Sequence, residues 1–202
     1  MNPLELIQGT EEWLAYKAGR VSASHIVDVM AGGKGITRNK YMAKLIVERL
    51  TEAPVETYSS GSMEWGINTE PEARSAYCFF RSVEVVEVGF VDHPTLPLTG
   101  CSPDGLVGDN GLVEIKCPES HTHLETLLSE KIDPKYIKQM QFQMCVTGRK
   151  RCDFISFDPR FPEKNKLWVK RVERDEVMIK DMEIAVVKFN TELLEKIERL
   201  SK

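Results

Sequence analysis

The spacing of apolar and polar positions predicts helices in the N-terminal part of the chain. Apolar residues recur with helical periodicity over residues 10–18, 22–31, 38–50 and 62–80. Thr10 suits the N-cap of the first helix, and Gly32-Gly33 is expected to end the second. On the third, Lys44 and Glu48 fall mostly on the polar side. Pro71 has no backbone donor, so the fourth should kink or restart just after Glu70.

Connections and strands follow from other signals. Residues 34–39 read as a basic loop, and Ser59-Ser60-Gly61 marks a second connection. Residues 83–91 are rich in β-branched residues and predict a strand, and strand-like pieces continue over 98–107. Gly108-Asp109-Asn110-Gly111 is a hairpin signal, because Asn-Gly readily takes positive φ at both central positions. Residues 112–117 would then form the returning strand.

The C-terminal part predicts alternating helices and strands. Helices are expected over 121–130 and 135–146, the second capped by Gly148, and strands over 152–157 and 167–172. A long helix from Asp175 carries an apolar stripe made of Val177, Met178, Met182, Ala185, Val186, Phe189, Leu193 and Leu194. We therefore predict one domain over residues 1–202, of the α/β (α+β) class, with a central mixed sheet flanked by helices.

Composition narrows the class of protein. The chain has 202 residues and a formal net charge of −4, which argues against a surface coated with positive charge but allows a local basic channel. Its five cysteines have no CxxC spacing, so buried reduced thiols are expected rather than a zinc site or iron–sulfur cluster. The sequence shows neither a signal peptide nor an apolar run of ~18 residues, so a cytoplasmic location is expected.

Two carboxylates and one lysine are expected to meet on the predicted hairpin. Asp104 follows Pro103 at the first strand, and Glu114 and Lys116 lie two residues apart on the second. Side chains of a strand alternate with a period of two, so Glu114 and Lys116 project from one face while Ile115 points into the core. The turn then brings Asp104 beside Glu114.

This group suits a divalent cation, because two close carboxylates repel one another unless positive charge lies between them. Mg²⁺ or Mn²⁺ prefers oxygen ligands, and one or two ions held by Asp104 and Glu114 would support phosphodiester hydrolysis. The backbone carbonyl of Ile115 is a further candidate ligand. Lys116 would orient or deprotonate the attacking water, or stabilise charge in the transition state. A surface hairpin with a charged pair is the alternative interpretation.

Pro-Asp followed after nine residues by Glu-x-Lys is the signature of the PD-(D/E)xK nuclease superfamily, which implies a restriction-endonuclease-like core. Over most of its length, the sequence resembles the phage lambda exonuclease (YqaJ-type viral recombinase) family. The matching segments are Trp13 with Gly19 and residues 21–24, Trp65-Gly66 with Glu70 and Ala73-Arg74, and residues 100–106, 111–118, 136–141, 157–160 and 172–175.

The resemblance implies a Mg²⁺-dependent enzyme that digests one strand of linear duplex DNA from a 5′ end, releasing mononucleotides. Family members form ring-shaped homotrimers around DNA and work with a single-strand annealing protein in phage recombination. The protein is therefore expected to be phage- or prophage-encoded and to act on duplex ends in a bacterial host cell. We expect no membrane to be involved.

Residue roles follow from motif positions in the same resemblance. It implies that Glu70, Asp104 and Glu114 are metal ligands and that Lys116 is the catalytic lysine. It also implies that Gln139 positions the metal-bound water or a nearby carboxylate.

The resemblance further implies a pocket for the 5′-phosphate, in which Ser24 and Ser102 help to grip the phosphate. The family often has arginine at the position of Lys17 in this pocket, and lysine keeps the charge but loses the bidentate fork. Arg20 is close in sequence and is an alternative for the same role.

Plainer interpretations exist for several of these residues. Without the resemblance, Glu70 would be a solvated charge on a helix face. Gln139 and Gln143 are four residues apart and would form a polar helix face. His121 and His123 are expected to be exposed rather than zinc ligands.

Three functions are compatible with these patterns. The first is a 5′-to-3′ exonuclease of phage recombination. The second is another PD-(D/E)xK endonuclease or repair nuclease. The third is a DNA-binding or assembly subunit with a silent site, against which the intact set of Asp104, Glu114 and Lys116 argues.

Overall fold

The computed structural model describes residues 2–31, 35–55 and 61–200. Its helices are η1 (Pro3–Glu5), α1 (Glu11–Lys17), η2 (Ala23–His25), α2 (Ile26–Met30), α3 (Ile36–Thr51), α4 (Gly61–Arg81), α5 (Ser120–Ser129), α6 (Pro134–Thr147) and α7 (Glu176–Leu200). Its strands are β1 (Val21–Ser22), β2 (Val91–Asp92), β3 (Thr99–Cys101), β4 (Gly105–Val107), β5 (Gly111–Lys116), β6 (Arg151–Phe157) and β7 (Leu167–Glu173). Predictions that fall on Gly32, Gly33, Lys34, Ser59 and Ser60 lie outside the described residues.

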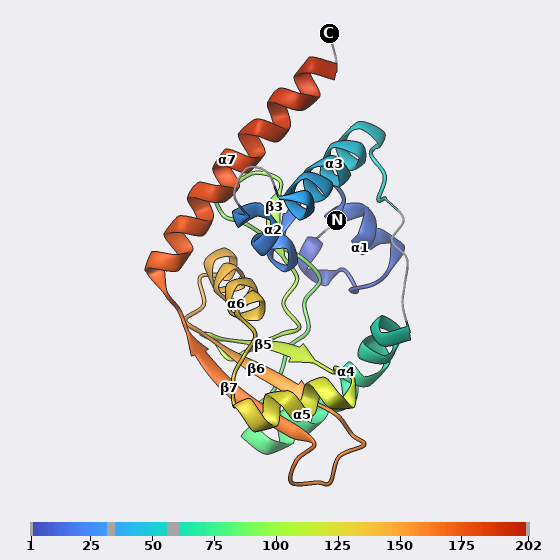
Figure 1. The fold of residues 1–202 in the computed structure, drawn as a ribbon, viewed down its shortest axis with the longest axis vertical. Helices are drawn as coiled ribbons and strands as arrows, with labels where there is room; N and C mark the ends of the chain where they lie inside the picture. Colours follow the sequence, from blue (N-terminus) through green and yellow to red (C-terminus); the bar gives the residue numbers. More distant parts are fainter. Residues whose placement is uncertain (1, 32–34, 56–60, 201–202) are drawn as a thin grey trace.

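A four-stranded sheet of order β4-β5-β6-β7 forms one half of the molecule (Figure 1). Strands β5 and β6 are parallel and the other pairs are antiparallel. Leu112 of β5 contacts Met140 and Met144 of α6 on one face of the sheet. Val113 packs with Ala73 and Tyr77 of α4 on the other face. The expected mixed sheet flanked by helices is therefore confirmed.

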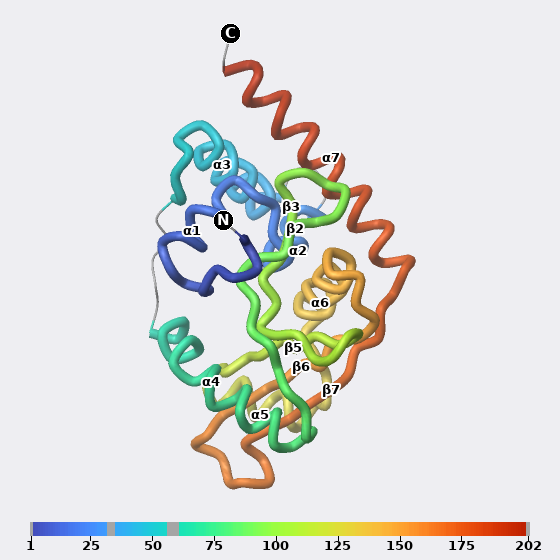
Figure 2. Tube along the Cα trace, turned by 180° about the vertical axis from the view of Figure 1, so that it is seen from behind, coloured from blue at the N-terminus to red at the C-terminus, as the bar shows by residue number. Residues whose placement is uncertain are grey.

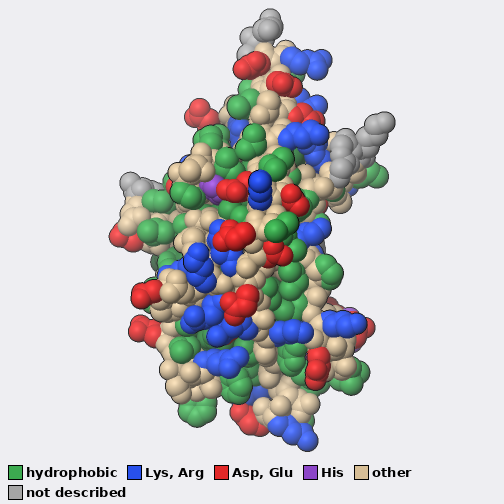
Figure 3. Space-filling model, turned by 90° about the vertical axis from the view of Figure 1, so that its left-hand side faces the viewer, with side chains coloured by type: hydrophobic (Ala, Val, Ile, Leu, Met, Phe, Trp, Pro, Cys, Tyr) green, Lys and Arg blue, Asp and Glu red, His purple; other side chains and the backbone are tan. Residues whose placement is uncertain are grey.

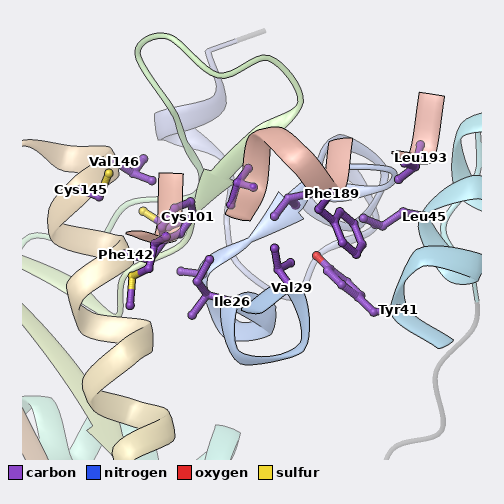
Figure 4. Close-up of a cluster of buried hydrophobic side chains, with 14 of the residues drawn as sticks. Ile26, Val29, Tyr41, Leu45, Cys101, Phe142, Cys145, Val146, Phe189 and Leu193 are labelled. Carbon is purple, nitrogen blue, oxygen red and sulfur yellow. The ribbon is translucent and has the colours of Figure 1, made fainter. Parts of the chain in front are cut away.

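The other half is helical and is organised around a small sheet of order β1-β3-β2. Figure 4 shows its core, in which Tyr41 and Leu45 from α3 lie beside Phe189 and Leu193 from α7. Phe142 from α6 lies at the other end of the same cluster, near Cys145 and Val146. Helix α7 follows one side of the molecule and extends beyond it (Figure 1). On that side, positive and negative side chains are interspersed with hydrophobic ones (Figure 3). None of the described helices is long and apolar enough to cross a membrane.

The predicted strand over residues 83–91 is wrong for most of its length. Only Val86 makes a bridge, to Leu106, and β2 begins at Val91. The backbone N–H groups of Gly89 and Phe90 instead donate to carbonyls of the N-terminal segment, at 2.9 and 2.8 Å. Figure 2 shows this extended segment along the back of the molecule, between the end of α4 and β2.

Three boundaries also differ from the prediction. Ser22, predicted as the first residue of a helix, lies in β1, and α3 already begins at Ile36, within the predicted basic loop. Helix α4 continues through Pro71 without a restart. The hairpin lies where expected, but its positive φ is at Gly108 (49°), and Gly111 is the first residue of β5.

Burial was mispredicted at several polar and apolar positions. His123 is fully buried, and its ring nitrogens bond Ser156 and the carbonyl of Asn165 at 2.8 Å, which leaves neither for a metal. Glu48 is buried as well. The ends of the predicted α7 stripe are solvent-exposed, since Val177 is 75% and Leu194 50% accessible.

Candidate functional site

The hairpin β4-β5 joins Asp104 to the strand that carries Glu114. Gly105 pairs with Val113, so continuing this antiparallel register places residue 104 opposite residue 114. The Oδ2 atom of Asp104 accepts a hydrogen bond from the backbone N–H of Ile115 at 2.6 Å. The N–H and C=O of one strand residue point to the same side, so the Ile115 carbonyl is directed toward the same edge. One carboxylate and one carbonyl oxygen thus face a common point, as the spacing predicted.

Glu114 is fully buried and its carboxylate is surrounded by donors. Its Oε1 atom accepts hydrogen bonds from Nε2 of Gln139, at 2.7 Å, and lies 2.5 Å from Nζ of Lys116. Its Oε2 atom accepts a hydrogen bond from Nε2 of Gln143, also at 2.7 Å. The predicted alternation is therefore present, with Glu114 and Lys116 on the face of the sheet covered by α6. Helix α6 supplies two amides rather than the one expected.

Lys116 lies between a carboxylate and an aromatic ring. Its Nζ is 5.3 Å from the ring centroid of Tyr136, which itself packs against Phe154. Burial alone would lower the pKa of Lys116, but the charges of Glu114 and Asp104 outweigh burial and raise it well above its ordinary value. The amine is therefore held as an ammonium ion by the two acids beside it.

Two acidic side chains near Lys116, Asp104 and Glu70, have raised pKa values. Desolvation, followed by the charge of Glu114, raises the pKa of Asp104 to about 8. Desolvation also raises the pKa of Glu70, against the attraction of Arg74. Two of the predicted ligands thus resist ionisation, which is the electrostatic situation that a divalent cation relieves. The oxygen-only donor set at Asp104, Glu114 and the Ile115 carbonyl fits such an ion.

Glu70 lies near this centre but is held by a neighbour on its own helix. Its Oε1 is 2.5 Å from Nη2 of Arg74, and Nη1 of Arg74 is 3.0 Å from Glu87. Both Glu70 and Lys116 line a cavity of about 420 Å³, together with Ser62, Met63, Gly66, Ile67, Ile115, Cys117, Pro118 and Tyr136. Glu70 could reach a cation there, in competition with Arg74.

A second and larger cavity, of about 1090 Å³, adjoins the first, and both are lined by Met63, Ile67 and Glu70. Its wall carries side chains of both charges: Lys17, Arg20, Lys44 and Arg74, and also Glu5, Glu48, Glu70 and Glu87. Strand β1 places Ser22 on the same wall, next to β3 and the loop that leads to Asp104. The cavity that Lys17 lines therefore adjoins the one that Glu70 and Lys116 line.

The predicted phosphate-binding residues are only partly brought together. Nζ of Lys17 lies 4.4 Å from the ring centroid of Trp13, and Nε1 of Trp13 donates to Oγ of Ser102 at 3.0 Å. Oγ of Ser24 lies 3.1 Å from Oγ of Ser22. Burial and the nearby Lys44 lower the pKa of Lys17 to about 8. Trp13, Lys17 and Ser22 line the larger cavity, and Ser24 and Ser102 contact it only through Ser22 and Trp13.

Arg20 is engaged elsewhere. It donates to the carbonyl of Tyr16 at 2.5 Å, stacks on the Tyr16 ring and lies 3.6 Å from Asp92. These contacts direct its guanidinium toward Asp92, so Lys17 is the better placed cation of the two.

A second group of possible metal-binding atoms is formed by His93, Cys145 and Glu183. Nε2 of His93 is 3.5 Å from both Cys145 Sγ and Glu183 Oε1. However, Nδ1 of His93 accepts from the backbone N–H groups of Thr95 and Leu96, at 3.2 and 3.1 Å. A neutral ring must then carry its proton on Nε2, whereas a metal-binding histidine usually donates from its other nitrogen. The group is better explained as packing between α6 and α7.

Sequence reasoning missed three residues of the centre. Gln143 was interpreted as part of a polar helix face, although its spacing of four from Gln139 already placed the two side by side. Tyr136 lies within a matched motif but was given no role. The contact of Arg74 with Glu70 has the i,i+4 spacing of a helical ion pair, which was also visible in the sequence.

Comparison with known proteins adds independent information. The model of the family described as "YqaJ-like viral recombinase domain" matches residues 12–150. A crystal structure of LHK-Exo, an alkaline exonuclease from Laribacter hongkongensis, is similar with 46% identity, a TM-score of 0.90, and coverage of 95% of this chain and 96% of that one. LHK-Exo in complex with dAMP is similar with 47% identity, the same TM-score and the same coverage.

A more distant likeness concerns the fold alone. The phage-related exonuclease from Haemophilus somnus 129PT has 14% identity and a TM-score of 0.73, over 90% of this chain and 96% of that one. A search of curated proteins found no match.

Proposed function

The chain belongs to the family of YqaJ-like viral recombinase domains, whose members are recombination nucleases acting on DNA, and we propose that it is a divalent-metal-dependent 5′-to-3′ exonuclease. It would degrade one strand of linear duplex DNA to mononucleotides. The observation that carries this proposal is the meeting of Asp104, Glu114 and Lys116 on one hairpin, with Ile115 N–H to Asp104 at 2.6 Å and Lys116 to Glu114 at 2.5 Å.

Asp104, Glu114 and the Ile115 carbonyl would hold Mg²⁺, or Mn²⁺, with Glu70 as a further ligand. One or two such ions, when bound, neutralise charge on the phosphoryl oxygens and make water a better nucleophile. Gln139 would keep the Glu114 carboxylate in place. These residues supply a set of oxygen donors whose mutual repulsion favours taking up a cation.

Lys116 would act as a hydrogen-bond donor and a positive charge toward the scissile phosphate. Glu114 and Asp104 raise its pKa, so the amine is protonated at neutral pH and is a poor base in that state. A fixed ammonium ion aimed at the developing charge lowers the barrier more than one that must reorganise. The Tyr136 ring beneath it restricts the side chain.

The 5′ end of the digested strand would bind in the larger cavity. Lys17 would meet the terminal phosphate with Ser24 and Ser102, while Arg20 stays paired with Asp92. The shared border at Met63, Ile67 and Glu70 supports a path from this cavity to the acidic centre. Binding of the terminal phosphate would then set which phosphodiester is cut.

The assembly and setting are further parts of the proposal. The protein would act as a single nuclease domain over residues 1–202, within a homotrimeric ring that surrounds the duplex. A single-strand annealing protein would receive the exposed strand. These events would take place in the cytoplasm of a bacterial host, as part of a phage or prophage recombination system. Sedimentation of the free protein tests the trimer directly.

The polarity is tested with one duplex carrying ³²P on the 5′ phosphate of one strand, and the same duplex labelled at the 3′ end instead. In Mg²⁺, we expect labelled mononucleotide at once from the first substrate and only late from the second. A closed circular duplex should stay intact, and Asp104→Asn should degrade neither linear substrate. Early release of the 3′ label would show that digestion runs from the 3′ end. Fragments from the circle would indicate an endonuclease.

A further inference from the structure

The second amide of α6, on Gln143, contacts the oxygen of Glu114 that no other described side chain holds. Oε1 of Glu114 receives both Gln139 and Lys116, whereas Oε2 receives Gln143 alone, at 2.7 Å. Each carboxylate oxygen has about two acceptor positions. Oε1 is therefore saturated, and the acceptor position that remains for a cation lies on Oε2.

Gln143 makes this contact at a cost. The residue is fully buried, and its own Oε1 has no hydrogen-bond partner among the described residues. An unpaired buried carbonyl is unfavourable, and an apolar side chain of the same shape would avoid it. Turning the amide over would set its oxygen against the Glu114 carboxylate. The contact that the Gln143 side chain makes is therefore with Glu114, and it does not improve the packing of α6.

Gln141, two residues earlier on the same helix, shows what a purely structural glutamine looks like here. Its Nε2 donates to the carbonyl of Glu173 at 2.8 Å, and its Oε1 accepts from the N–H of Asp175 at 2.8 Å. Both ends are paired, and they tie α6 to the start of α7. It is about as deeply buried as Gln143, but its two polar ends bond Glu173 and Asp175 and not Glu114.

From this contrast we propose that Gln143 is a positioning residue for the nuclease reaction: it orients Oε2 of Glu114 toward the cation site. The inference rests on the proposed function, because it presumes that Glu114 is a metal ligand. Without Gln143, the carboxylate stays anchored at Oε1 but turns freely at Oε2. The loss therefore weakens cation binding itself, before any DNA is present.

The experiment compares Gln143→Met with Gln141→Met, since methionine keeps the length of glutamine and removes both its donor and its acceptor. Mg²⁺ binding is measured by calorimetry without DNA, and thermal unfolding in parallel. For Gln143→Met, we expect ~10- to 100-fold weaker Mg²⁺ binding, as for other residues that orient metal ligands. For Gln141→Met, the melting temperature should fall while Mg²⁺ affinity stays within about twofold of wild type.

Kinetics provide a second readout. Gln143 has no exposed surface with which to contact DNA, so kcat should fall in Gln143→Met while KM for duplex ends is unchanged. If that variant does not fold, Gln143→Asn serves instead, because it keeps the amide but withdraws it from Oε2 by one methylene group. The same loss of Mg²⁺ affinity is expected.

Asp104→Asn separates failure of this inference from failure of the proposed function. If Asp104→Asn loses Mg²⁺ binding but Gln143→Met binds within twofold of wild type, Gln143 has no positioning role and the inference is overturned. If Asp104→Asn also binds Mg²⁺ normally, the cation site itself is misplaced and both fall.

Discussion

The backbone N–H of Ile115 donates to the Asp104 carboxylate at 2.6 Å, and this bond ties the first acid of the centre to the strand that carries the second. The contact spans 11 positions of sequence but lies within one hairpin. Asp104 is consequently fixed relative to Glu114 by local structure. Burial first, and then the nearby charge of Glu114, raise the pKa of Asp104.

The first prediction concerns Lys116. Replacing it with methionine should lower kcat by on the order of 10²- to 10⁴-fold, because a fixed positive charge at the scissile phosphate is lost. The fold should persist, since the Lys116 side chain is 29% exposed. Lys135→Met is the matched control, because Lys135 lies over the same Tyr136 ring at 4.7 Å but points to Asp133. If Lys135→Met were as inactive as Lys116→Met, the loss of activity would come from the lost contact with the Tyr136 ring and not from the lost charge at the phosphate.

The second prediction is a pH dependence of stability. The pKa of Asp104 is raised to about 8 in the folded protein, whereas an unfolded aspartate has a pKa of about 3.9. Between these values the folded state binds more protons, so the free energy of unfolding should decrease as pH rises from about 4 to 8. Between pH 5 and 8, urea denaturation should show this decline, by on the order of 1–3 kcal/mol.

Two comparisons isolate that effect. Asp104→Asn cannot titrate and should show a flatter profile over the same range. Saturating Mg²⁺ should also flatten the wild-type profile, since the ion favours the ionised carboxylate. Parallel curves for wild type and Asp104→Asn would mean that Asp104 ionises normally.

The third prediction concerns the 5′ end. Lys17→Gln should reduce the preference for 5′-phosphorylated over 5′-hydroxyl duplex by about tenfold, which is one charge-assisted contact. Arg20→Gln should leave the preference unchanged, because Arg20 pairs with Asp92. The preference is measured by letting the 5′-phosphorylated and 5′-hydroxyl duplexes compete in one reaction. Equal preference in wild type and Lys17→Gln would refute the assignment.

Titration of Lys17 gives a fourth prediction. Its pKa is lowered to about 8, so its positive charge is present below that pH and is lost above it. The wild-type preference for a 5′-phosphate should therefore decline as pH rises above about 8, and the Lys17→Gln preference should not. A preference that holds up to pH 10 in wild type would place the phosphate on another group.

The fifth prediction concerns the backbone conformation at Gly19, two residues after Lys17. Gly19 has a φ of 72°, and a Cβ there would lie 2.7 Å from Cγ of Arg49. Gly19→Ala should destabilise the protein by at least ~1–2 kcal/mol. Gly66→Ala is the control, since its Cβ would meet nothing within 4 Å on α4, and it should be neutral or stabilising. Equal melting temperatures for the two variants would contradict the strained position of Gly19.

Much of the centre was predictable because it is local. The turn at 108–111 and the alternation along β5 fix where Asp104, Glu114 and Lys116 meet. Their meeting can therefore be predicted without knowing any contact between distant parts of the chain. The predicted strand over 83–91 failed for the opposite reason. Its β-branched residues suit a strand, but the amides of Gly89 and Phe90 are bonded by the N-terminal segment, far away in sequence.

Side-chain partners were the least predictable feature. Glu48 looks like a surface charge, yet it is buried and accepts the backbone N–H of Gly19 at 2.9 Å. His123 is buried for a similar reason, since Ser156 and Asn165 come to it from elsewhere in the chain. Periodicity tells which face a residue occupies but not what the tertiary fold brings to that face.

The central claim is that Asp104 and Glu114 hold the cation with which the DNA strand is cut. It is tested most directly by the initial rate on 5′-phosphorylated linear duplex over a range of Mg²⁺ concentrations, for wild type and folded Asp104→Asn. We predict a wild-type rate that rises to saturation with Mg²⁺ and vanishes in chelator. The variant rate should be at least on the order of 10³-fold lower at every concentration. Digestion by Asp104→Asn at the wild-type rate would contradict the account.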